Sequence, residues 1–91
     1  PYVVSFIEYL RTEAHLSDNT VAAYRRDLRK FYEWLAGRKP TKLSVQELSD
    51  YAKWLHAKKL APASLARHLI SLKLFYRYLQ LESITVDNPA E

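Results

Sequence analysis

The sequence contains no cysteine and no methionine, and Gly37 is its only glycine. The absence of cysteine excludes both a disulfide framework and a thiolate metal site within these 91 residues. Three histidines stand at positions 15, 56 and 68, without the spacing of metal ligands. We therefore expect no metal and no cofactor. No apolar run approaches the ~20 residues of a membrane-spanning helix, and no signal peptide is visible.

Constellations of catalytic groups are also missing. The sequence shows no paired carboxylates beside a base, no nucleophile spaced with histidine and an acid, and no glycine-rich phosphate loop. We expect no catalytic residue in this chain. Because the chain begins with proline rather than methionine, we expect it to be a fragment of a longer protein. Its 91 residues suffice for one small domain with a modest core.

Positive charge is what the chain has in excess. The formal net charge of +4 favours an anionic partner, without choosing among nucleic acid, a membrane surface and an acidic protein. Residues 25–42 hold seven basic and two acidic side chains, whereas residues 81–91 hold three acids and no base. The charge is therefore polarised along the chain.

Apolar residues recur at helical spacing in four segments, and no segment alternates with a period of two. The predicted fold is all-α, a compact four-helix domain with orthogonal or bundle-like packing. Helices are expected over about residues 2–14, 18–36, 45–58 and 62–81. The third of these is expected to bury Val45, Leu48, Ala52 and Leu55.

Residues typical of helix ends support these boundaries. Either Ser17 or Asp18 is a plausible N-cap, and the only glycine stands where a C′ residue belongs. Ser44 and Glu47 have the spacing of a capping box. Pro62 suits the first position of the last helix, because its ring presets a helical φ.

The helix expected over residues 62–81 is apolar on almost every side, except for one polar wedge. A core stripe is expected along Leu65, Leu69, Leu72, Tyr76 and Leu79, and the wedge consists of Ser64, Arg67, His68 and Ser71. The wet side of a structural helix is one interpretation of the wedge. The other is a binding surface, since hydroxyl, guanidinium and imidazole groups adjoin a helix N-terminus, which attracts anions.

The helix expected over residues 18–36 presents the same choice. Arg25, Arg26, Arg29 and Lys30 lie within six positions, and Asp27 is the only acid between them. Surface bases often serve solvation alone, while their stems cover apolar surface. This cluster is denser than solubility requires, and Arg25 and Arg29 flank the apolar stripe, where packing would hold their stems.

Two segments carry a family resemblance. They read "FIEYLRTEAHLSDNTVAAYRRDLRKFYEWL" and "PASLARHLISLKLFYRYL". Together they resemble the N-terminal core-binding (SAM-like) domain of the tyrosine recombinase/phage integrase family, with the Xer-type site-specific recombinases most similar. The resemblance covers about residues 4–90. It implies a SAM-like orthogonal bundle over residues 1–87, with residues 88–91 starting a linker to an absent C-terminal catalytic domain.

In that family, this domain and the catalytic domain clamp duplex DNA, and the second and fourth helices face the major groove. Carried over, the resemblance implicates Asn19, Thr20, Tyr24, Arg25, Arg29, Ser64, Arg67, His68 and Ser71. Tyr24 could instead be purely a core residue. The resemblance assigns strand cleavage to the absent domain, and it implies no metal and no catalytic residue here. It also implies double-stranded DNA and other recombinase subunits as partners, no membrane, a monomeric isolated domain and a cytoplasmic location.

Two departures from the family pattern affect the expected contacts. Many relatives have serine where this chain has Ala61, so one helix cap and one phosphate contact are lost. Relatives often show Ser-Ala at the positions of Ile70 and Ser71, so the hydroxyl is shifted by one residue. The alternative function is a helical protein–protein interaction domain whose basic face meets an acidic partner.

Overall fold

The structure, a computed structural model, describes residues 2–82 and shows four α-helices and one short 3₁₀ helix in that range. The elements are α1 (Tyr2–Thr12), α2 (Asp18–Leu35), η1 (Pro40–Lys42), α3 (Val45–Ala57) and α4 (Pro62–Leu81). No strand occurs within the described residues, so the predicted all-α fold is confirmed. The linker predicted at residues 88–91 lies outside the described range.

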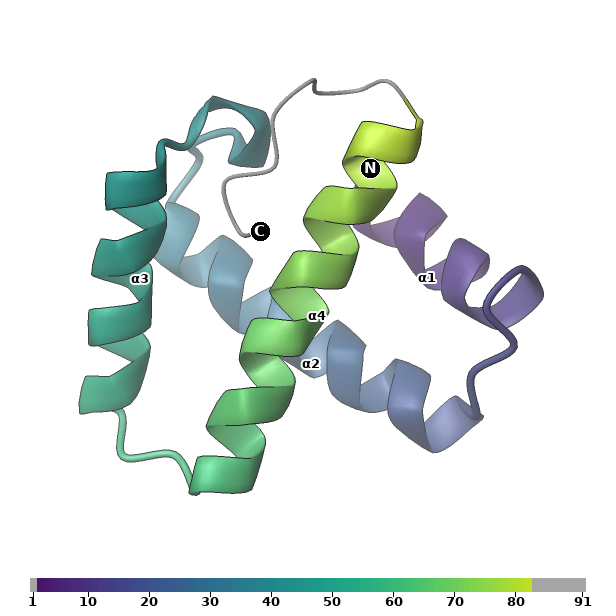
Figure 1. Cartoon of the computed structure of the whole chain (residues 1–91), viewed down its shortest axis with the longest axis horizontal. Coiled ribbons are helices and arrows are strands. Elements are labelled where there is room, and N and C mark those ends of the chain that lie inside the picture. Colours follow the sequence, from purple (N-terminus) through teal and green to yellow (C-terminus); the bar gives the residue numbers. More distant parts are fainter. Residues whose placement is uncertain (1, 83–91) are drawn as a thin grey trace.

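Helix α4 is the central element of the domain. It crosses in front of α2 in Figure 1, with α3 on one side and α1 on the other, and it packs against all three. A helix covered on three sides buries apolar residues around most of its circumference. The largest fully buried apolar side chains are Phe6, Leu10, Leu28, Phe31, Leu35, Tyr51, Leu55, Leu72, Phe75, Tyr76 and Leu79.

The predicted helix starts are confirmed by their hydrogen bonds. Ser17 is the N-cap of α2, and its Oγ accepts a hydrogen bond from the backbone N–H of Thr20 at 3.2 Å. In α3, the backbone N–H of Glu47 donates to Ser44 Oγ, and the Glu47 carboxylate accepts from the Ser44 N–H, each at 3.1 Å. This reciprocal pair is a capping box. Pro62 is the first residue of α4, as predicted.

The end of α2 is built from two left-handed residues and one arginine. Ala36 has φ 51° and Gly37 has φ 92°, which turns the chain out of the helix. Arg38 then reaches back: its Nε and Nη2 donate to the carbonyl oxygens of Leu35 and Trp34 at 3.0 and 3.2 Å. Its guanidinium also lies 4.3 Å from the centre of the Trp34 ring. Arg38 therefore stabilises the C-terminal end of α2.

Three expectations about the core need correction or completion. Leu48 and Leu55 are buried as predicted, but Val45, the first residue of α3, is 68% exposed, and Ala52 is only half-buried. Tyr51, which the apolar pattern did not single out, is also fully buried. Leu69, predicted for the core stripe of α4, is 38% exposed, so it does not belong to the core.

Candidate nucleic-acid interface

Asp27 turns inward from the most basic stretch of α2. Only 4% of its surface is exposed, and its carboxylate accepts two hydrogen bonds from Arg67 of α4. Arg67 Nε lies 2.9 Å from Oδ2 and Nη2 lies 2.6 Å from Oδ1. This two-pronged geometry is the strongest form of an arginine–carboxylate contact. The Arg67 side chain remains 37% exposed, so the pair joins the core to the surface.

The surroundings keep Asp27 ionised. Burial alone would raise the pKa of this carboxyl, but hydrogen bonds and charge from Arg67 and His68 outweigh it and hold the pKa below its ordinary value of 3.8. The same contact raises the pKa of the Arg67 guanidinium, mainly through its hydrogen bonds to Asp27. At neutral pH, Asp27 and Arg67 are therefore both charged and form a salt bridge between α2 and α4.

Two further residues of the polar wedge belong to this buried network. Ser71 Oγ donates to the His68 carbonyl at 2.7 Å and lies 3.4 Å from Asp27 Oδ2. His68 Nδ1 lies 3.5 Å from Asp27 Oδ1, and its Nε2 lies 2.6 Å from the Tyr51 hydroxyl of α3. With Nδ1 protonated, the ring would accept a hydrogen bond from Tyr51 and point its N–H at Asp27. The network thus ties α2, α3 and α4 together.

The expectation that the whole wedge faces solvent is wrong for His68 and Ser71. They are 1% and 0% exposed, because α2 and α3 cover the side of α4 from which they project. Polar groups at such a position find partners inside the protein, as these do. Solvent still reaches the other two wedge residues, Ser64 and Arg67, which are half-buried.

One side of α2 continues the surface next to the Asp27–Arg67 pair. At 100° per residue, Asn19, Ala23, Arg26 and Lys30 fall within about 60° of one another, beside Asp27. Asn19 and Arg26 are exposed and Lys30 is half-buried. Within residues 2–82, neither base of this strip takes part in an ion pair or a side-chain hydrogen bond.

Thr20 and Tyr24 lie near this surface in supporting positions. The Thr20 hydroxyl accepts a hydrogen bond from Ser17 Oγ at 2.9 Å, so it is part of the helix cap. Tyr24 is half-buried against the core, and its phenol lies near enough to contribute to the raised pKa of Arg67, behind the larger effect of Asp27.

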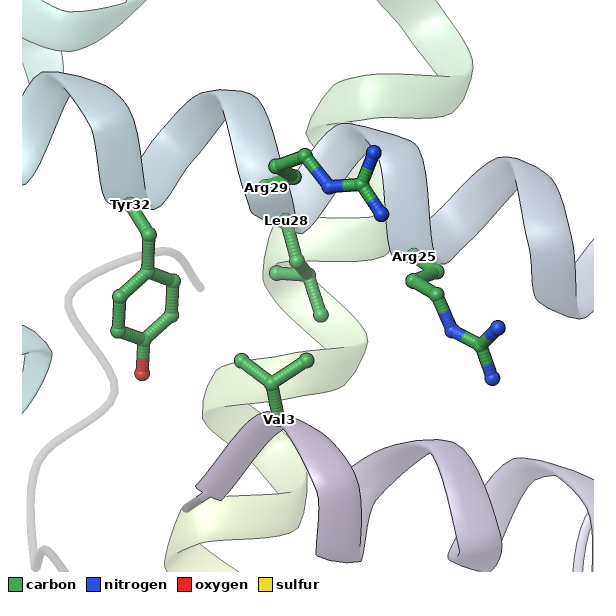
Figure 2. A pocket seen from close by; sticks show the side chains of 5 residues that line it. All are labelled: Val3, Arg25, Leu28, Arg29 and Tyr32. Carbon is green, nitrogen blue, oxygen red and sulfur yellow. The ribbon is translucent and has the colours of Figure 1, made fainter.

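Arg25 and Arg29 lie elsewhere. Both are about 160° around α2 from Asp27, and they line a cavity of about 250 Å³ between α1 and α2 (Figure 2). The structure therefore does not bring them together with Arg67. The family resemblance implicated both, and their position beside the apolar stripe supported them, whereas Arg26 and Lys30 were not among the implicated residues. The recurrence of Asn19, Arg26 and Lys30 on one helical face was the signal that could have found them.

Other kinds of site find no support in the described part of the chain. Residues 2–82 contain no group of three side chains that could hold a metal ion. Within the same range, no helix combines the length and the apolar character needed to cross a bilayer.

Comparison with known proteins adds a family signal. The sequence profile of the family described as "Phage integrase, N-terminal SAM-like domain" matches residues 3–83. The chain is 34% identical to the tyrosine recombinase XerD of Vibrio cholerae over 90 residues, which cover 97% of the chain and 30% of that protein. It is 36% identical to the tyrosine recombinase XerC of Anoxybacillus flavithermus over 87 residues, covering 92% of the chain and 29% of that protein. The chain thus spans less than a third of the length of these curated relatives.

Proposed function

Because the chain belongs to the phage integrase N-terminal SAM-like domain family, we propose that it is the DNA-binding module of a site-specific tyrosine recombinase. In this proposal, α2 and α4 grip a duplex half-site. Strand cleavage and rejoining are carried out by a part of the recombinase outside these residues. Other recombinase subunits are the further partners.

The single observation that carries this proposal is the inward turn of Asp27. Four bases surround it in the sequence, and burial against Arg67 removes its charge from the outer surface of α2. Apart from Asp27, no acid lies within four residues of Arg25 or Arg26, and Glu33 is the only acid within four residues of Arg29 and Lys30. Bases therefore outnumber acids on the surface of this stretch, and such a field attracts the phosphate backbone and steers its approach.

The strip beside Asp27 supplies the proposed contacts. Arg26 and Lys30 neutralise phosphates, and the amide of Asn19 contacts a phosphate or a base edge. From α4, Ser64 lies in the first helical turn, where free N–H groups favour an anion. Arg67 uses two of the five guanidinium N–H donors to bind Asp27, so three remain for a phosphate or a base.

In this scheme, Asp27 is a positioning residue. A free arginine side chain loses rotamer entropy when it binds a phosphate. Asp27 has already fixed the Arg67 guanidinium across the helix crossing, so less entropy remains to be lost. His68 and Ser71 support Asp27 from inside and contact no DNA themselves.

The test is the salt dependence of DNA binding by the chain and a double variant. Fluorescence anisotropy with a short labelled duplex, between about 50 and 200 mM salt, counts the phosphates that are neutralised. Log K falls as log salt rises, and the variant Arg26→Ala/Lys30→Ala is expected to make this negative slope shallower by about 2, at roughly 0.9 per lost contact.

The matched control is Lys53→Ala/Lys73→Ala, which removes the same charge from exposed positions of α3 and α4. It is expected to keep the wild-type slope. Equal slopes for the two double variants would show that only net charge matters, and they would refute the proposed strip.

A further inference from the structure

A groove runs between α1 and α2 on the side of α2 that carries Arg25 and Arg29. Its first hollow has a volume of about 250 Å³ and is lined by Val3, Arg25, Leu28, Arg29 and Tyr32 (Figure 2). An adjoining hollow of about 240 Å³ is lined by Val3, Val4, Ile7, Glu8 and Arg25. Because Val3 and Arg25 line both, the two hollows form one continuous surface feature.

The groove combines an apolar floor with a cationic rim. Figure 2 shows Val3 of α1 and Leu28 of α2 pointing toward each other, with the Arg29 guanidinium alongside α2 and the Arg25 side chain extending from α2 toward α1. Within residues 2–82, Arg25 and Arg29 have no ion pair or hydrogen bond of their side chains. Val4 is 70% exposed at the edge, although valine usually avoids water. Guanidinium groups without a partner and an exposed apolar side chain therefore lie together along this groove.

We propose that this groove docks a short acidic and apolar segment of a partner protein. One aliphatic side chain of the segment would lie against Val3 and the ring of Tyr32, which are half-buried and cover the fully buried Leu28. Its neighbouring carboxylates would bind Arg25 and Arg29, whose planar guanidinium groups match a carboxylate with two parallel hydrogen bonds. This inference concerns a different side of α2 from the proposed DNA contacts and does not depend on them.

The openness of the groove argues against a small-molecule ligand. Pockets for small molecules and cofactors enclose most of the ligand. Both hollows here are open to solvent, which suits a side chain of a peptide lying across the surface.

Charge and polarity also favour a peptide over nucleic acid. A DNA backbone would supply phosphates to the rim but no aliphatic group to cover the apolar floor. The Glu8 carboxylate lines the far end of the groove, where its only ion pair within residues 2–82 is a 3.8 Å contact with Arg11. Its charge would repel a phosphate chain running the length of the groove. A peptide can instead place its carboxylates at the Arg29 end and its apolar residue toward α1.

The probe is a short fluorescein-labelled peptide with glutamates at one end and leucines at the other. A second peptide replaces each leucine by serine and keeps every charge. Binding of both to the 91-residue chain is measured by fluorescence anisotropy. Two double variants are compared with the wild type: Arg25→Gln/Arg29→Gln, and the control Lys53→Gln/Lys73→Gln, which loses the same charge. Thermal unfolding of each variant verifies that it is folded.

The glutamate–leucine peptide is expected to bind the wild type and the control equally, and to bind Arg25→Gln/Arg29→Gln at least tenfold more weakly. To each of the three proteins, the serine peptide is expected to bind at least tenfold more weakly than the glutamate–leucine peptide does. Equal binding of the two peptides would refute the apolar part of the site. Equal binding to both variants, displacement of the peptide by one equivalent of duplex DNA, or no binding at all would overturn the proposal.

Discussion

Replacing Asp27 by alanine tests the buried network most sharply. Asp27→Ala removes the acceptor of two Arg67 hydrogen bonds at 2.9 and 2.6 Å and leaves the guanidinium unpaired. Breaking a buried ion pair by removing one partner costs about 3–5 kcal/mol. Because the Arg67 side chain is 37% exposed, water replaces part of the lost interaction. We therefore expect a loss of about 2–3 kcal/mol, which lowers the Tm by roughly 10–20 °C for a domain of this size.

The reverse change should cost more. Arg67→Ala leaves a carboxylate that is only 4% exposed without its main partner, so the full range of about 3–5 kcal/mol applies. At acid pH, the difference in stability between the wild type and Arg67→Ala should become smaller. The pKa of Asp27 is lowered in the native protein, so its contribution is present above the ordinary value of 3.8 and is lost as the pH falls through the native pKa. Below about pH 4 the wild type should therefore approach the variant in stability.

Urea unfolding followed by the fluorescence of Trp34 and Trp54 measures these losses. The matched control is Glu33→Ala, which removes an exposed carboxylate from the same helix and should change stability by less than about 0.5 kcal/mol. A double-mutant cycle with Asp27→Ala/Arg67→Ala isolates the coupling between the two residues. The reasoning fails if Asp27→Ala costs no more than Glu33→Ala, or if Arg67→Ala is the milder of the two network variants.

Three further expectations concern the caps and one tyrosine. Ser44→Ala removes one half of a capping box and should cost about 1 kcal/mol in urea unfolding, whereas Ser49→Ala, within the same helix, should cost less. Gly37→Ala should cost about 1 kcal/mol through its φ of 92° alone, since nothing lies within 4 Å of the added Cβ, and Gly37→Asn should cost less. Burial, with a smaller effect of Tyr2, raises the pKa of Tyr32 to about 12. In an ultraviolet titration the Tyr32 phenol should therefore remain protonated at about pH 11, and its contribution to stability should be lost between the ordinary pKa of 10.0 and about 12.

Much of the fold could be predicted because its determinants are local. A serine three residues before the backbone N–H that it accepts from, as at Ser17 and Ser44, fixes a helix start wherever the helix lies in the domain. Pro62 and Gly37 act through their own φ angles, which need no distant partner. Apolar spacing then determined which side of each helix faced inward in most cases.

The site could be predicted only in part, because its organising contact is not local. Asp27 and Arg67 are 40 residues apart in the sequence. Helical spacing shows which residues share a face, but not which neighbouring helix covers that face. His68 and Ser71 were therefore assigned to solvent, although α2 and α3 cover them and supply their polar partners. One sequence feature did point inward, namely a single acid, Asp27, within a cluster of four bases.

The most direct test of the DNA-binding proposal is an amide-shift NMR titration of the chain with a short duplex, at low and then at moderate salt. We expect the shifts to gather at Asn19, Arg26 and Lys30 on α2 and at Ser64 and Arg67 on α4, and to fade as salt is added, because phosphate neutralisation dominates such binding. Shifts confined to the groove around Arg25 and Arg29, or the absence of shifts at low salt, would contradict the proposed interface.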